Sequence, residues 1–291
     1  MRIVEPGSRT KTEKKKRGQW PLITLIVAIL AIAVYFTTQV RSEVNLVSVS
    51  EINPDSSVTE NPTPDQLQDI DELRGSGALR TFSGNEFRLL YDQLLQPNLD
   101  KVDLPPAITG NDQADSIIRQ IAEERGYKLR SNPLTELTST SGPLLQDSVH
   151  QPWLDLQAEA LSEGYDISIV SAFRSVDTQR SLFLARLAAE GVNVDNVAAG
   201  LADAEVDTVL ITSSIPGYSK HHTGYTFDLL CAGYGFDDFV SSDCNDWLEA
   251  NNYEKAKKHG FIPSYPPDAD LQGPDPEAWE YVYVGIDLLT H

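Results

Sequence analysis

The hydrophobic positions of this chain form one long apolar run near the start and shorter periodic patterns further on. The run extends from Trp20 to Phe36 and is interrupted only by Pro21 and Thr24. A helix rises about 1.5 Å per residue, so roughly 17 to 20 apolar residues cross a hydrocarbon core of about 30 Å. The run therefore predicts a transmembrane anchor over residues 20–38.

A basic cluster precedes this run, formed by Lys11, Lys14, Lys15, Lys16 and Arg17. The positive-inside rule then predicts that residues 1–19 are a cytoplasmic basic tail and that the rest of the chain is extracytoplasmic. A basic flank before an apolar core is also typical of a cleaved signal peptide, which remains the alternative. No small-x-small cleavage site follows Phe36, which favours an uncleaved anchor and a single-pass protein of the cytoplasmic membrane.

The segment after the run has a different composition. From Glu43 to about Pro64 it is rich in Ser, Pro, Asn, Asp and Glu and poor in large apolar residues. Such a segment cannot offset the conformational entropy lost on ordering. Residues 39–79 are therefore predicted to be a flexible acidic linker, and residues 80–291 the folded domain.

Within that domain the periodicity alternates between helical and extended patterns. Apolar residues at helical spacing predict helices over residues 87–95, 113–125, 151–162, 178–190 and 247–259. β-Branched and aromatic residues predict short strands over residues 167–171, 224–230 and 279–284. Helices mixed with short, non-repeating strands predict an α+β fold, a small mixed domain with a short antiparallel sheet flanked by helices.

Charge and cysteine content narrow the class. The formal net charge of −20 argues against a nucleic-acid partner, because phosphate binding needs a basic face. The two cysteines, Cys231 and Cys244, lie close together on the predicted extracytoplasmic side, where a disulfide can persist. Their spacing suits a disulfide that closes a loop better than a pair of metal ligands. Two free thiols are the alternative.

The stretch from Pro216 to Leu230 carries the most chemical information. His221 and Asp228 lie on either side of Gly224, where the backbone can turn sharply before the predicted strand. An aspartate among aromatic and aliphatic residues is costly to bury alone, so a metal ion shared with the imidazole is one explanation. A pairing of Asp228 with an arginine, with His221 merely exposed, is the other.

Three ordered motifs resemble a known family. The pattern Ser219-x-His221-x-x-Gly224-x-Thr226-x-Asp228 is similar to the SxHxxGxAxD signature of the VanY-type zinc D-alanyl-D-alanine carboxypeptidases. The segment from Ser171 to Gln179 resembles that family's S-x-x-R-S-x-x-x-Q element. Near the end of the chain, Trp247-Leu248, then residues 259–266, then residues 276–285 resemble its closing segments in the same order. The resemblance covers about residues 80–291.

The resemblance implies a role for each matching residue. His221 and Asp228 match zinc ligands, and Glu277 matches the catalytic base. Arg174 matches an arginine that faces the substrate at the reaction centre. Ser219 and Gln179 are expected to help hold the terminal carboxylate and amide of a peptide, with ordinary loop capping as the alternative. His222, next to His221, is expected to point away or to support a ligand.

The sequence departs from the family pattern at two positions. Thr226 replaces an alanine, which leaves room for an extra hydroxyl contact. Glu280 stands where the family has its third zinc ligand, a histidine, so the implied site is His-Asp-Glu. Two anionic ligands cancel the charge of zinc and should make its bound water less acidic. We expect Glu277 and Glu280 to reach a common point across one turn, with Trp279 packed behind.

Two functions follow from these observations. The first is a zinc-dependent D,D-carboxypeptidase, or an L,D relative, that removes the C-terminal D-amino acid from peptidoglycan stem peptides outside the membrane. The second is a catalytically inactive module that binds wall peptides and has a degenerate metal site. Retention of Glu277, Arg174 and Ser219 together favours the enzyme. The aromatic stripe of Trp279, Tyr281 and Tyr283 is interpreted as core packing.

Overall fold

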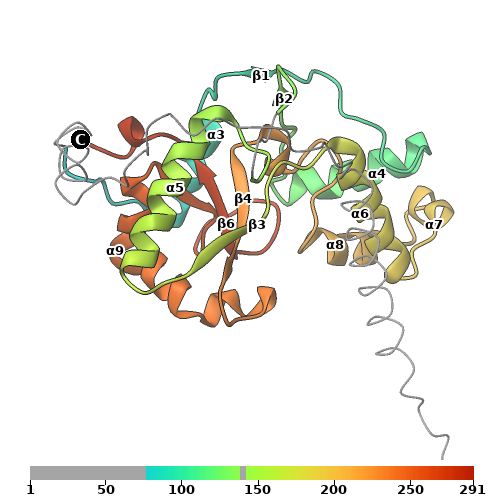
Figure 1. The fold of residues 1–291 in the computed structure, drawn as a ribbon. Helices are drawn as coiled ribbons and strands as arrows, with labels where there is room; N and C mark the ends of the chain where they lie inside the picture. Colours follow the sequence, from blue (N-terminus) through green and yellow to red (C-terminus); the bar gives the residue numbers. More distant parts are fainter. Residues whose placement is uncertain (1–76, 138–141) are drawn as a thin grey trace, which may run out of the picture. The chain divides into compact units, whose positions relative to one another are not determined.

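The computed structural model describes residues 77–137 and 142–291 (Figure 1). The predicted basic tail, the predicted anchor over residues 20–38 and nearly all of the predicted linker lie outside these residues. Among the residues that the structure describes, no helix is both long and apolar enough to cross a membrane.

The centre of the domain is a four-stranded antiparallel sheet in the order β3-β4-β6-β5. Its strands are β3 (Ile167–Ser171), β4 (Thr226–Cys231), β5 (Phe261–Tyr265) and β6 (Glu277–Tyr283). A second, two-stranded sheet pairs β1 (Leu99–Asp100) with β2 (Asn132–Pro133). Short antiparallel sheets with flanking helices confirm the predicted α+β class.

One hydrophobic core, here called the sheet core, joins this sheet to α3 (Gly84–Gln93), α5 (Asp147–Ser162) and α9 (Asp243–Lys258). Phe227 on β4 lies at its centre, with its ring 5.3 Å from that of Trp153 on α5 and 5.2 Å from that of Phe261 on β5. Because side chains alternate along a strand, Phe227 and Leu229 enter this core while Asp228 faces the other way.

A second core, here called the helical core, is built by α4 (Asp112–Glu124), α6 (Val176–Ala189), α7 (Val194–Ala198) and α8 (Asp203–Leu210). These helices lie to the right of β3 and β4 in Figure 1, whereas α5 and α9 lie to the left. The described residues also form three 3₁₀ turns: η1 (Lys220–Thr223), η2 (Phe236–Ser241) and η3 (Ile286–Leu288).

The element boundaries differ from the predicted ones for local reasons. The predicted strand over residues 224–230 begins at Thr226, because Gly224 ends η1 with a left-handed backbone (φ 73°). Helix α9 begins at Asp243, four residues before the predicted start at Trp247, because the Ser242 side chain caps it by accepting a hydrogen bond from the Asn245 amide.

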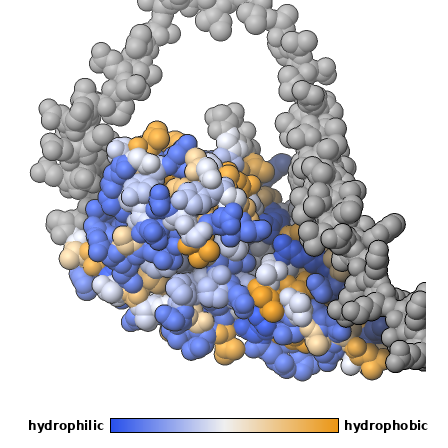
Figure 2. All heavy atoms as spheres, turned by 90° about the horizontal axis from the view of Figure 1, so that it is seen from below, coloured by the Kyte–Doolittle hydropathy of each residue, from blue (hydrophilic) through white to orange (hydrophobic). Residues whose placement is uncertain are grey.

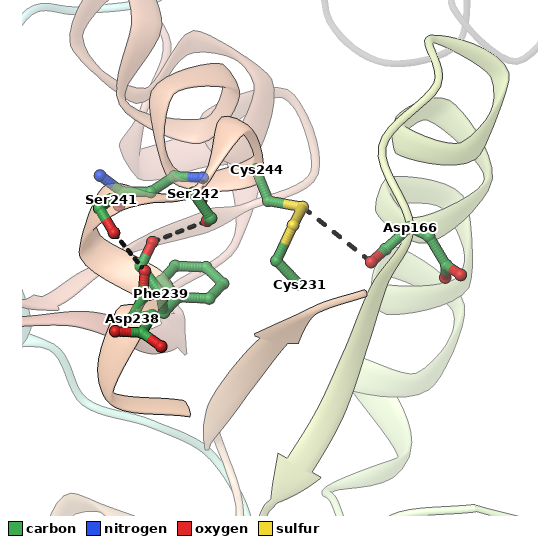
Figure 3. Close-up of a disulfide and its surroundings, with 8 residues drawn as sticks. Asp166, Cys231, Asp238, Phe239, Ser241, Ser242 and Cys244 are labelled. Carbon is green, nitrogen blue, oxygen red and sulfur yellow. Dashed lines mark hydrogen bonds between the residues drawn. A yellow bond between two sulfur atoms is a disulfide. The ribbon is translucent and has the colours of Figure 1, made fainter. Parts of the chain in front are cut away.

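Cys231 and Cys244 form a disulfide with an S–S distance of 1.98 Å (Figure 3). Cys231 is the last residue of β4 and Cys244 lies in the first turn of α9. The bond therefore closes the loop that contains η2 and ties it to the sheet core.

On the face shown in Figure 2 the described residues are mostly hydrophilic, with hydrophobic residues in small separate groups.

Candidate metal centre and active site

His221 is held in place by the tight turn η1. The Ser219 side chain caps this turn by accepting a hydrogen bond from the His221 amide (3.3 Å), and Gly224 ends it. The left-handed backbone of Gly224 favours glycine, and a Cβ atom there would also have to displace the end of the Leu137 side chain, 2.6 Å away. The turn directs a buried imidazole toward the strand that carries Asp228.

The His221 ring has two different partners. Nδ1 donates a hydrogen bond to the Ala172 carbonyl (2.6 Å). Nε2 lies 3.3 Å from Asp228 Oδ1 and 3.3 Å from Glu280 Oε2. His221, Asp228 and Glu280 are all buried, and each offers a ligand atom within 4.8 Å of the others. The structure thus brings together the three residues that the sequence assigned to a metal site.

This cluster fits a zinc ion. Ligand atoms about 2.0–2.1 Å from a tetrahedral zinc are about 3.3–3.4 Å apart, which matches both distances from His221 Nε2. Asp228 Oδ1 is buried and accepts no hydrogen bond from the described residues, so its lone pairs are available. The hydrogen bond to the Ala172 carbonyl keeps the proton on Nδ1 of a neutral His221 ring. This tautomer leaves the lone pair of Nε2 free to bind a metal, as in many histidine–zinc sites.

The electrostatics of the cluster favour a positive charge where its members meet. Burial disfavours charge on His221, but the carboxylates of Asp228 and Glu280 outweigh it and raise the pKa of His221 to about 10. Burial likewise disfavours the Glu280 carboxylate, but His221, Lys220 and Ser264 overcome this and lower the pKa of Glu280 to about 2. A divalent cation is a natural occupant of such a point.

Glu280 has a second set of contacts behind it. Ser264 Oγ donates a hydrogen bond to Glu280 Oε1 (2.5 Å), and the fully buried Lys220 donates one to the Ser264 carbonyl. The Lys220 ammonium lies 3.8 Å from the ring centroid of Tyr265. Glu280 is therefore supported by a hydroxyl donor and by the nearby Lys220 amine, whose own pKa burial lowers to about 7.

Glu277 and Glu280 belong to a strand, so the expected helical turn between them is wrong. Residues three apart on a regular strand face opposite sides. The pairing of β6 with β5 is irregular, however, because Pro263 is opposite Tyr281 whereas Tyr265 is opposite Glu277. β6 therefore carries extra residues at this point, and both glutamates line the same cavity. Burial, with Glu280 and Asp228 nearby, raises the pKa of Glu277 well above its usual range.

Arg174 lies near Oδ2 of Asp228, the carboxylate oxygen that His221 does not face. Its Nη1 donates a hydrogen bond to Gln179 Oε1 (2.9 Å), and its Nη2 donates one to Ser171 Oγ (3.0 Å) and lies 3.8 Å from Asp228 Oδ2. Gln179 also donates from Nε2 to the Ser214 carbonyl (2.6 Å). The Gln179 oxygen therefore orients Arg174, and one N–H group of Gln179 holds the Ser214 carbonyl.

His222 does not join the metal cluster. Its Nδ1 donates a hydrogen bond to the Arg174 carbonyl (2.6 Å), and its Nε2 accepts one from the Gly217 amide (3.0 Å). Burial lowers the pKa of His222 to about 4, which keeps the ring neutral, as this pair of bonds requires. His222 supports the backbone of Arg174, in line with the supporting role expected for it.

The aromatic stripe packs as expected, since Tyr281 lies in the sheet core and Trp279 and Tyr283 pack against it. Trp279 also lines the cavity, where its ring centroid lies 4.9 Å from that of Phe236 in a tilted arrangement. Thr226 Oγ1 is buried without a hydrogen-bond partner among the described residues, so its hydroxyl adds no contact there.

A cavity of about 360 Å³ connects these groups. Besides the residues predicted from the sequence, its wall includes Tyr127, Arg186, Ser213, Phe236 and Asp237. The sequence did not predict them because they lie in separate segments: the connection between α4 and β2, helix α6, the loop after α8 and the loop closed by the disulfide. Only Phe236 and Asp237 carried a signal, since they lie between the two cysteines.

Comparison with known proteins gives a consistent result. Residues 142–286 match the family model described as "VanY: D-alanyl-D-alanine carboxypeptidase". A D-alanyl-D-alanine carboxypeptidase of Enterococcus faecalis (strain ATCC 700802 / V583) is 29% identical over 168 residues, which are 55% of this chain and 58% of that protein. The putative carboxypeptidase YodJ of Bacillus subtilis (strain 168) is 30% identical over 130 residues, which are 43% of this chain and 41% of that protein.

The chain thus spans less than two thirds of the length of either curated relative. Among solved structures, a mutant of the vancomycin-resistance D,D-pentapeptidase VanY in complex with Zn(II) is similar at 23% identity, with a TM-score of 0.39, over 57% of this chain and 83% of that one. The family match contains His221, Asp228, Glu277 and Glu280, the residues that meet in the cavity. The chain therefore belongs to the VanY family of D-alanyl-D-alanine carboxypeptidases.

Proposed function

We propose that this protein is a zinc-dependent D,D-carboxypeptidase, or an L,D relative, that removes the C-terminal D-amino acid from peptidoglycan stem peptides. The observation that carries the proposal is the convergence of a metal-ligand cluster, a partly buried glutamate and an arginine on one cavity. Its volume of about 360 Å³ suits the end of a peptide better than a folded protein.

The ligands are His221, Asp228 and Glu280. When bound, zinc supplies Lewis acidity and lowers the pKa of a coordinated water molecule. Glu277 lies in the same cavity, and its raised pKa suits a group that accepts a proton from water and passes it to the leaving amine. Arg174 is fixed by Gln179 and Ser171, so its guanidinium can donate to the peptide carbonyl oxygen as negative charge develops there.

An inactive wall-peptide-binding module is the second candidate, and one feature favours it. Asp228 and Glu280 together cancel the charge of a divalent metal, which weakens its action on water. Against it stands Glu277, since a module that only binds has no use for a partly buried carboxyl group beside the ligands. The supported position of Glu280, with Ser264 donating to it, also indicates a maintained ligand.

We further propose that the protein acts at the outer face of the cytoplasmic membrane. The support is the apolar run from Trp20 to Phe36 with its basic flank, together with a substrate class that lies outside the cell.

The test uses the full chain, purified and loaded with zinc, and two peptides that end in D-Ala-D-Ala or in an L-residue followed by D-Ala. Release of D-alanine from one of them, lost on chelation and restored by zinc, is the expected result. The preferred peptide assigns D,D or L,D specificity. Tight peptide binding without any release would instead establish the binding module.

A further inference from the structure

Two arginines line the cavity, and they differ in what surrounds them. Arg174 is engaged by Gln179, Ser171 and Asp228. Arg186, on α6, uses one N–H group to donate to the Thr212 carbonyl. No ion pair between Arg186 and a carboxylate occurs within residues 77–137 and 142–291. Arg186 is thus a half-buried cation of the cavity wall whose charge has no direct counterion in the described protein.

Next to Arg186 lies a hydroxyl group without a partner. α6 holds the segment after α8 at two points, through Gln179 to the Ser214 carbonyl and through Arg186 to the Thr212 carbonyl. Ser213 lies between them, is 3% exposed and lines the cavity. Its Oγ is buried and forms no hydrogen bond with any described residue. A buried hydroxyl of this kind costs free energy unless a bound molecule satisfies it.

The spacing along α6 places this pair beside the reaction centre. Gln179 and Arg186 are two helical turns apart on one face, about 10 Å along the axis. Gln179 contacts Arg174, so Arg186 lies about two turns further along the same wall. One residue of extended peptide spans about 3.5 Å. A peptide whose scissile carbonyl lies at Arg174 therefore has its terminus within reach of the long Arg186 side chain.

A carboxypeptidase needs a group that recognises a free chain end. The sequence pointed to Gln179 and Ser219, which can each still donate a hydrogen bond, because Ser219 Oγ only accepts from the His221 amide and Gln179 Nε2 has a second N–H group. Both side chains are neutral, however, and neither supplies the positive charge that would balance a carboxylate. We infer that Arg186 and Ser213 bind the C-terminal carboxylate of the substrate, on the residue that is released. Burial and the nearby Arg174 lower the pKa of Arg186, although the Glu277 carboxylate opposes them, and an anion bound between the arginines would offset both lowering effects. The inference rests on the proposed function.

The experiment compares a peptide ending in D-Ala-D-Ala with its C-terminal amide, using the full zinc-loaded chain. kcat/KM is measured for both peptides, and calorimetry gives the Kd of each independently of turnover. The variants are Arg186→Met and Ser213→Ala. Arg180→Met is the matched control, because Arg180 lies on the same helix but pairs with Asp177 and does not line the cavity.

We expect the wild type to bind the free acid more tightly than the amide by about 10- to 100-fold, the value of one charge-assisted hydrogen bond. Arg186→Met should remove that preference by weakening the acid alone, and Ser213→Ala should reduce it several-fold. Arg180→Met should behave as wild type. Ser213→Ala breaks no hydrogen bond within the described residues, so a change in its acid preference cannot be ascribed to misfolding.

The inference falls if the wild type does not distinguish acid from amide, or if both variants keep the full preference. If no peptide is cleaved, but the acid is bound preferentially and Arg186→Met abolishes that preference, the carboxylate subsite is confirmed although the proposed enzyme activity is not. If the peptide is cleaved and both variants keep the preference for the free acid over the amide, the proposed enzyme activity holds and the subsite assignment is wrong.

Discussion

Asp228 on β4 and Glu280 on β6 are direct partners across the sheet. Directly opposed residues of an antiparallel pair project from the same face. His221 Nε2 lies 3.3 Å from a carboxylate oxygen of each, so the strand pairing itself assembles the cluster. A glutamate at position 280 is therefore placed to serve as a ligand where the family has histidine.

Removing Glu280 should weaken metal binding. If Glu280 is a ligand, Glu280→Ala should lower zinc affinity by more than the 10- to 100-fold typical of changes in groups that only support ligands. Ser264→Ala, which removes the hydroxyl that donates to Glu280, is the matched comparison and should stay within that smaller range. Competition with a chromogenic chelator measures both. Equal zinc affinity in Glu280→Ala and wild type would end the ligand assignment.

Glu280→His should restore a site with one anionic ligand. The complex then keeps one positive charge, so the bound water should be more acidic and hydrolysis of a D-Ala-D-Ala peptide near neutral pH should increase. The measurement is kcat against pH for zinc-loaded protein. A lower rate at every pH, with zinc fully bound, would contradict this account of Glu280.

Glu277→Gln should separate metal binding from catalysis. Glu277 lines the cavity without being one of the clustered ligand atoms, so zinc affinity should stay near the wild-type value. Loss of the general base should lower kcat by about 10²- to 10⁴-fold. Zinc titration and D-alanine release test the two halves, and retention of most activity would remove Glu277 from its catalytic role.

The disulfide should stabilise the domain and shape the cavity. In the chain-entropy model a loop of this size contributes about 3 kcal/mol. The double variant Cys231→Ala/Cys244→Ala should therefore melt about 6–12 °C lower. Phe236 and Asp237 of the closed loop line the cavity, so KM should rise more than kcat falls. Mass spectrometry of the exported protein that found two free thiols would rule out the bond.

Glu159 should make stability depend on acid pH. Its hydrogen bond with His259 (2.6 Å), helped by Lys255 and opposed by burial, lowers the pKa of Glu159 to about 2. Because the folded-state pKa lies below the unfolded value of about 4.5, this stabilisation is complete above pH 4.5 and disappears as pH falls toward 2.

Glu159→Gln should therefore lower the free energy of unfolding by about 2 kcal/mol at pH 7 and by much less near pH 2.5. Glu254→Gln is the control, since its pair with Lys258 is largely exposed and should contribute little. Urea denaturation at several pH values measures both variants. A constant difference across this pH range would show that the ion pair is not the cause.

The predicted anchor leads to a test in cells. The full chain should be recovered in the membrane fraction, with its carboxy-terminal domain accessible to protease from outside, because basic residues precede the apolar run from Trp20 to Phe36. A mature protein whose amino terminus lies beyond Phe36 would replace the anchor by a cleaved signal peptide.

The sequence by itself determined the parts of this protein that depend on short stretches of chain. His221, Gly224 and Asp228 lie within one turn-and-strand segment, so their spacing already predicted a shared site. The main helices and strands followed from local periodicity for the same reason. The proximity of Cys231 and Cys244 in sequence also limited how far apart they could lie.

Only the tertiary structure decided the contacts between distant segments. It placed Glu280 opposite Asp228, put Glu277 and Glu280 on one side through an irregular strand pairing, and turned Gln179 toward Arg174. It also brought Arg186 and Ser213 into the cavity, although neither lies in a recognisable motif. Local patterns reflect which side chains are buried, whereas the register of strands and the packing of helices decide which of them meet.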